Sequence, residues 1–313
     1  MSPSETVANV NRIPAGINIG LAVLYGALNV GQFFILPIFF LQSDLRWAWV
    51  LLPVALLNNP YWSLLHEAIH DLFYPDSRIN GIAGRALSVM FGSPFRILRL
   101  SHLLHHKLNR TPIEGTEFYE RGKVSVFSAA AGYYFQILGG LYVVEFLSPL
   151  LFFLPRAWLR KFAARAIKPA TVSAILMQSW TRDESIREIR KDGLLIVAWF
   201  GTALYCYGNY WPLLAAILAA RGLLISFLDN VYHYRTPVSD IFYAKNLWLP
   251  RLAARILLNF NLHGIHHRHP AVPWRGLPLL FRERAEIYHG NYFAAAARQL
   301  CGPVALQDLP RAG

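Results

Sequence analysis

The chain has 313 residues, of which 55% are hydrophobic and only 15% carry a charged side chain. Charged residues make up about a quarter of an ordinary soluble domain, so this composition excludes such a domain and indicates an integral membrane protein. The formal net charge of +12 does not indicate a nucleic-acid-binding protein. The basic residues flank apolar runs, where they would contact anionic lipid headgroups.

The first apolar run predicts a membrane anchor. Residues 13–43 contain no charged residue, and Ile17–Leu41 would span about 38 Å as a helix. That exceeds a hydrocarbon core of roughly 30 Å. The run is too long for the apolar region of a signal peptide and lacks a basic start, so we expect it to remain in the protein. A second uncharged run, Trp47–Leu65, is expected to cross back and to deliver His66 at its end.

Two further apolar segments follow. Gly193–Leu228 is interrupted by the residues 208–212 and predicts a helical hairpin with an aromatic belt around its turn. Val126–Leu154 is uncharged except for Glu145. Its 29 residues are too few for two spans.

If the histidines before and after the middle of the chain share one metal site, they lie on one side of the membrane. The chain must then cross the membrane an even number of times between His106 and His263. The hairpin supplies two crossings, so Val126–Leu154 is expected to be an interfacial or re-entrant helix pair, bent at Gly139 and Gly140. The basic stretch Arg156–Asp192 indicates the cytoplasmic side. Arg221 lies inside the second hairpin helix, where it is either paired within the bundle or functional.

These runs predict an all-α integral membrane protein with four transmembrane helices. Cytoplasmic and interfacial helices would carry the metal site, and residues 1–313 would form a single domain. Both termini and the metal site are expected in the cytoplasm, and the membrane is expected to be a bacterial inner membrane.

Histidine clustering is the most informative feature of the sequence. Eight of the 11 histidines fall into three clusters with helical spacing, namely His66 and His70; His102, His105 and His106; and His263, His266 and His267. Spacings of three and four residues place side chains on one face of a helix. Eight imidazoles are too many for one tetrahedral zinc ion. They suit two metal ions, and imidazole without thiolate fits iron among the plausible choices. His269 and His289 lie outside the clusters and are expected to be ordinary polar residues.

Other redox sites are not evident from the sequence. Cys206 lies in an apparent span and Cys301 near the end of the chain, so neither a disulfide framework nor a thiolate metal site is expected. The chain also lacks a flavin or nicotinamide fingerprint and the His-Pro-Gly-Gly motif of a fused haem carrier. Electrons for any redox reaction must therefore come from a separate protein.

The boxes HEAIH, HLLHH and HGIHH, in this order around paired apolar runs, resemble those of the membrane-bound fatty acid desaturases. The resemblance covers the chain from about Asn59 to Leu280. It implies a non-haem di-iron centre in which the boxes supply eight ligands and a ninth histidine follows the fourth span. Carried over to this sequence, the ligands are His66, His70, His102, His105, His106, His233, His263, His266 and His267.

The residues that precede His233 are candidates for supporting roles. Asp229 stands where the acyl-CoA branch of the family has an Asn that contacts one iron through water, and Asn230 is adjacent. Either side chain could bond a ring nitrogen, hold a metal-bound water or bind metal directly. Further carboxylates near enough in sequence to orient ligand rings, with solvated surface roles equally expected, are Glu67, Asp71, Glu114 and Glu117.

The resemblance implies an oxidoreductase that uses O2 and two electrons to introduce a C=C double bond into a fatty acyl chain. No catalytic residue beyond the metal ligands and no other cofactor-binding residue is expected. The basic face would attract an acidic ferredoxin-type electron donor, and the substrate would be a membrane lipid or another acyl compound.

A hydroxylase, ketolase or acetylenase acting on a lipid or carotenoid is the main alternative. A histidine-rich metal transporter is disfavoured, because the clusters lie at the ends of apolar runs rather than near the middle of the membrane.

Overall fold

The computed structural model describes residues 10–115, 117–169 and 171–310. The regular secondary structure of the described chain is helical apart from two short parallel strands, β1 (Phe118–Tyr119) and β2 (Val304–Ala305), with Phe118 opposite Val304. The all-α class expected from the sequence is confirmed.

The first apolar run forms one long helical element, composed of α2 (Ala15–Val30) and the π-helical η1 (Gly31–Phe40). The chain then returns beside it through η2 (Leu45–Val50), α3 (Leu51–Leu56) and α4 (Asn58–Ile69). The expected span Trp47–Leu65 is therefore not one continuous helix, because the chain breaks at Leu57. Every residue of α4 is buried, so its second half belongs to the protein interior.

Two helices with clear end signals follow, α5 (Ser77–Phe91) and α6 (Phe95–Leu108). The Asp76 carboxylate caps α5 by accepting the backbone N–H groups of Arg78 and Ile79. Gly92 ends this helix with a φ of +102°, which favours glycine. Pro94 then precedes the first turn of α6, the helix that carries the second histidine box.

The segment expected to be interfacial is a bent helical run composed of α7 (Val126–Phe135), η3 (Gln136–Gly140) and α8 (Leu141–Phe152). The predicted bend is confirmed, since Gly139 has a φ of +110°. A Cβ atom at Gly139 would lie 3.2 Å from the carbonyl carbon of Gly222, so the glycine allows η3 and α12 to approach closely. Leu138 and Gly139 have non-helical backbone angles, so the run consists of two helices, α7 and α8, joined at a kink. Its 27 residues are, by length and composition, also long and apolar enough to cross a membrane, so the interfacial or re-entrant placement stays a prediction.

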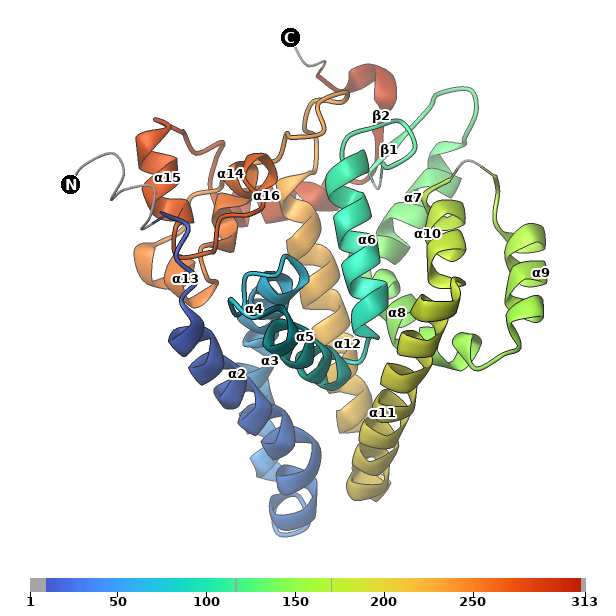
Figure 1. Ribbon diagram of the computed structural model, residues 1–313, viewed down its shortest axis with the longest axis vertical. Helices are drawn as coiled ribbons and strands as arrows, with labels where there is room; N and C mark the ends of the chain where they lie inside the picture. Colours follow the sequence, from blue (N-terminus) through green and yellow to red (C-terminus); the bar gives the residue numbers. More distant parts are fainter. Residues whose placement is uncertain (1–9, 116, 170, 311–313) are drawn as a thin grey trace.

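The chain continues through α9 (Arg156–Ala166) and α10 (Val172–Trp180) to the predicted hairpin. Its arms are α11 (Asp183–Tyr207) and α12 (Trp211–Asp229), which are joined by η4 (Gly208–Tyr210) and followed by η5 (Asn230–Tyr232). The arms run in opposite directions in Figure 1. Three helical runs in the described chain are long and apolar enough to cross a membrane, namely Ala15–Phe40, Val126–Phe152 and Asp183–Tyr232.

Short helices make up the rest of the chain and lie with part of α6 at the end of the molecule opposite the hairpin turn (Figure 1). They are α13 (Arg251–Ile256), η6 (Phe260–Leu262), α14 (His263–Arg268), α15 (Leu277–Glu283), α16 (Tyr292–Arg298), η7 (Gln299–Cys301) and η8 (Leu306–Asp308). Buried apolar residues from α4, α5, α6 and the C-terminal elements, including Leu65, Phe91 and Phe260, form one cluster, and the Phe260 ring contacts that of His66.

Arg221 is paired within the bundle rather than exposed to lipid. Its side chain is fully buried. It donates to the side-chain oxygens of Asn58 at 2.8 Å and Asn29 at 2.9 Å, and to the carbonyl oxygens of Met90 at 2.8 Å and Phe91 at 2.9 Å. These bonds connect α12 to α2, α4 and α5.

Candidate metal centre

Three short helical segments deliver the histidine boxes to one place. His66 lies in the last turn of α4 and His70 caps that helix, whereas the second box occupies the last two turns of α6. The third box forms most of α14. Gly264 in this box is required by packing, because a Cβ atom there would collide with the carbonyl oxygen of Ala244.

The nine histidines singled out in the sequence gather into two groups. Within each group, one ring nitrogen from every histidine lies within 4.8 Å of all the others, so each group is able to hold a metal ion. The first group contains His66, His70, His102, His106 and His266; the second contains His105, His233, His263 and His267. The structure therefore brings together all nine, including the isolated His233.

The ring nitrogens face one another at distances that suit shared ligation. In the first group, the Nε2 atom of His102 lies 2.9 Å from that of His70 and 3.1 Å from that of His106. In the second, the Nε2 atoms of His263 and His267 are 3.1 Å apart. If two imidazole nitrogens bind one ion with bonds of about 2.1 Å and a nitrogen–metal–nitrogen angle of about 90°, the nitrogens are about 3.0 Å apart. The observed spacing fits that arrangement.

The protonation state of the rings also fits metal binding, for which histidine must be neutral. Burial lowers the pKa of eight of the nine, to about 3 at His70 and about 2 at His106. The Nε2 atom of His66 is buried without a hydrogen-bond partner in the described chain. A buried nitrogen of this kind is costly unless a ligand satisfies it. The donor set thus fits two metal ions.

His105 differs because a carboxylate contacts its other nitrogen. Its Nδ1 atom lies 2.5 Å from Oε1 of Glu114. Burial alone would lower the pKa of His105, but the negative charge and hydrogen bond of Glu114 raise it above its ordinary value. A carboxylate on Nδ1 fixes the ring orientation and leaves Nε2 to face the second group.

The other candidate carboxylates are differently placed. Glu67 is buried and accepts the backbone N–H of Trp274 at 3.1 Å, and burial raises its pKa to about 8. Glu117 forms a buried ion pair with Arg110 at 2.6 Å. Asp71 is exposed and pairs with Arg99. Of these four carboxylates, only Glu114 has a hydrogen bond to a histidine ring.

Asp229 and Asn230 lie beside the second group, but neither hydrogen-bonds a histidine ring in the described chain. The Asp229 carboxylate accepts the indole N–H of Trp62 at 3.2 Å. The Asn230 amide donates to Oε1 of Gln299 at 2.6 Å, which directs this amide to the C-terminal segment.

The two histidines expected to have ordinary roles are outside both groups. Nδ1 of His289 accepts the backbone N–H of Asn246 at 3.0 Å, and the Asn246 side chain in turn accepts the N–H of Ile265 in α14. His289 therefore supports the third box indirectly. His269 follows α14 and is partly exposed.

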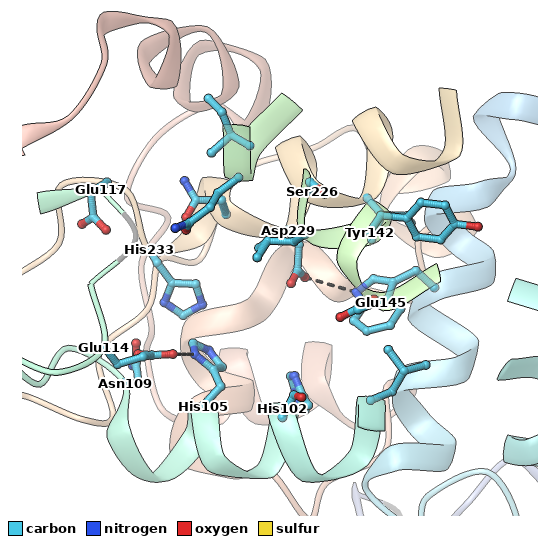
Figure 2. Close-up of a pocket in the computed structure, with 18 of the residues that line it drawn as sticks. His102, His105, Asn109, Glu114, Glu117, Tyr142, Glu145, Ser226, Asp229 and His233 are labelled. Atoms are coloured by element: carbon cyan, nitrogen blue, oxygen red, sulfur yellow. Dashed lines mark hydrogen bonds and ion pairs between the residues drawn. The ribbon is translucent and has the colours of Figure 1, made fainter. Parts of the chain in front are cut away.

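A cavity of about 230 Å³ opens beside the histidines. Figure 2 shows His102 and His105 on one wall, Asn109, Glu114 and Glu117 toward one end, and Tyr142, Glu145 and Ser226 toward the other. Glu145 was not among the site residues expected from the sequence. The signal that could have found it was its position as the single charge in an apolar run, since ionisable groups in such runs are costly and usually functional.

Comparison with known proteins gives one result that covers most of the chain. The family model described as fatty acid desaturase matches residues 45–296, which include all nine clustered histidines. No curated protein and no solved structure gives a significant match.

Proposed function

This chain belongs to the fatty acid desaturase family, and from this premise we propose that it introduces a C=C double bond into a fatty acyl chain in an O2-dependent reaction. The observation that carries the proposal is the convergence of three boxes and His233 into two adjacent groups of ring nitrogens. The cavity beside these groups would receive the acyl chain.

We assign the two histidine groups as the ligands of two iron ions. The first ion would be held by His66, His70, His102, His106 and His266, and the second by His105, His233, His263 and His267. Neutral rings and the unpartnered Nε2 of His66 support this assignment. Iron is the metal that the family and an all-imidazole donor set favour.

Iron, O2 and two electrons would together supply the oxidising power that an unactivated methylene requires. The chain's own residues hold and orient this centre. The Glu114 carboxylate is placed to accept a hydrogen bond from the Nδ1–H group of His105, and the buried side chains of Leu98, Ile137 and Ile225 limit water at the cavity. Limiting water suppresses side reactions of the oxidant.

Electrons would arrive from a separate acidic protein of the ferredoxin type. Lys107 is exposed next to His106 in α6, and the stretch Arg156–Asp192 is rich in basic residues. A basic surface speeds encounter with an acidic partner.

The basic stretch Arg156–Asp192 also supports placing the histidine groups on the cytoplasmic face of a bacterial inner membrane, with the whole chain acting as one domain.

Expression in a bacterial host with a simple fatty acid profile, followed by mass spectrometry of the lipids, tests the proposal. A desaturase removes two hydrogen atoms from a chain, whereas a hydroxylase of the same family adds one oxygen atom. A His102→Ala variant expressed to the same level is the control. An oxygen-containing product with no new alkene would contradict desaturation and establish the oxygen-inserting alternative.

A further inference from the structure

The cavity extends from His102, His105 and His233 to η3, α8 and α12. At the end farther from the histidines, polar side chains interrupt the apolar walls of the cavity (Figure 2). The polar side chains at this end and along the nearer wall are Ser101, Gln136, Glu145, Ser226 and Asp229.

Four of these side chains have no protein partner. Within the described residues, no hydrogen bond or ion pair engages the side-chain polar atoms of Ser101, Gln136, Glu145 or Ser226, whereas Asp229 accepts the indole N–H of Trp62. In Figure 2 the Glu145 carboxyl group is directed into the cavity, near Asp229. The unpartnered groups therefore share one space beside the proposed reaction centre.

A plain hydrocarbon chain does not suit this end of the cavity. Glu145 is the single acidic or basic residue in Val126–Leu154, and a charged side chain in such a run carries a substantial free-energy cost. An alkyl chain packed against Glu145, Gln136 and Ser226 would exclude water from them and leave them unpaired. A substrate that carries its own polar group would avoid this cost.

We propose that Glu145, together with Gln136 and Ser226, binds a hydrogen-bond donor carried by the substrate chain. The substrate is then a lipid with a hydroxyl or amide N–H group close to the reacting carbon, rather than an unsubstituted acyl chain. The proposal rests on the desaturase function given above and names its substrate class. Glu145 is the specificity-determining residue, because a carboxyl oxygen accepts such a bond and no protein donor in the described chain competes for it.

A neutral donor fits better than an ammonium group. Burying an ammonium group carries a larger desolvation cost than burying a hydroxyl or an amide. Sites built to hydrogen-bond a substrate hydroxyl strongly reject the analogue that lacks it.

The test compares matched lipids with the purified, iron-loaded enzyme reconstituted in nanodiscs and supplied with O2 and a reduced ferredoxin-type electron donor. The probes are stearoyl phosphatidylglycerol, its positional mono-hydroxystearoyl isomers and N-stearoyl butylamine. We expect kcat/KM for at least one hydroxylated or amide probe to exceed that for the plain lipid about tenfold or more, which corresponds to about 1.4 kcal/mol. This preference should fall to about one in Glu145→Leu and be partly retained in Glu145→Gln. Val144→Leu, on the outward side of the same helix, is the control.

Binding measured without O2 separates this inference from the proposed function. The same probes should raise the melting temperature of the wild-type protein in the same order, and Glu145→Leu should abolish the order. If no probe is turned over but the binding preference is present, the proposed reaction fails and the substrate class stands. Equal or weaker binding of every substituted probe, or a preference unchanged in Glu145→Leu, would overturn the inference and leave water as the partner of these side chains.

Discussion

The imidazole ring of His106 stacks on that of His267, with the ring centroids 4.3 Å apart and the planes inclined by 24°. The two residues come from α6 and α14 and belong to different histidine groups. Their contact places the two groups side by side. Two ions held there could share the two-electron change that the proposed removal of two hydrogen atoms requires.

His233 is the ligand with the weakest support in the sequence, because it belongs to no box. In the structure its ring lies 4.9 Å from that of His267 and 5.1 Å from that of His263, measured between centroids. We expect His233→Ala to lower iron content and activity as much as His267→Ala. Iron analysis with a turnover assay measures this, and full iron with full turnover would remove His233 from the site.

Asp229 should act more mildly than the ligands, because its carboxylate contacts Trp62 and no histidine ring. We expect Asp229→Ala to reduce metal affinity or activity by about 10–100-fold, as is usual for residues that support ligands. Asn230→Ala is the control at the next residue. It should lower stability more than iron content, because the Asn230 amide donates a hydrogen bond to Gln299. An Asp229→Ala variant as inactive as His233→Ala would instead indicate direct ligation.

Much of the site could be predicted from the sequence because it depends on local helical spacing. The clusters around His66, His102 and His263 are each made within one or two helical turns, so periodicity alone places their rings on one face. Assembly of the three clusters depends on tertiary packing, and their common chemistry was the signal for it. The role of Glu145 depends on which helix packs beside α12, which local spacing does not encode.

The fold was predicted less well where membrane spans were assigned from the length of uncharged runs, because packing within the protein also makes a segment apolar. Length and parity predicted a bent helix pair in Val126–Leu154, and the kink at Leu138 and Gly139 agrees with it, but the apolar run is also long enough to cross a membrane. The run Trp47–Leu65 is uncharged and mostly apolar, but its second half is buried in protein. Apolarity does not distinguish a protein interior from lipid.

Glu114 should control the metal affinity of the second group through His105. Glu114→Ala removes the carboxylate on Nδ1 of His105, and we expect about 10–100-fold weaker retention of one iron. Glu114→Gln should be intermediate, because its carbonyl can still accept the bond. Glu120→Ala, which removes a partner of exposed Lys123, is the control. Iron release during titration with a chelator measures the effect, and equal release rates in all variants would exclude a supporting role.

Arg221 should be important for stability rather than chemistry. Arg221→Met leaves the oxygens of Asn29, Asn58, Met90 and Phe91 without this donor. Each unsatisfied buried group costs about 1–3 kcal/mol, so we expect a markedly lower melting temperature in detergent. Arg165→Met, at an exposed site in α9, should change it little. A stable Arg221→Met variant with lost turnover would point to a functional role instead.

Membrane topology can be tested by labelling introduced cysteines after Cys206 and Cys301 are replaced by serine. Cysteines at Lys161 and Arg282 should be labelled from the cytoplasmic side, and one at Asn209 in the hairpin turn from the opposite side. This follows from the basic stretch 156–192 and from an even number of crossings between the histidine boxes. Labelling of Lys161 and Arg282 from opposite faces would contradict the four-span arrangement.

The most direct test of the two-group centre is the iron stoichiometry of the purified protein and of one variant from each group. We expect about two iron ions per chain in the wild type, and about one in both His66→Ala and His267→Ala, with both variants inactive yet inserted in the membrane. His269→Ala should keep both ions. One ion or fewer in the wild type, or two ions in both ligand variants, would contradict the two-group centre.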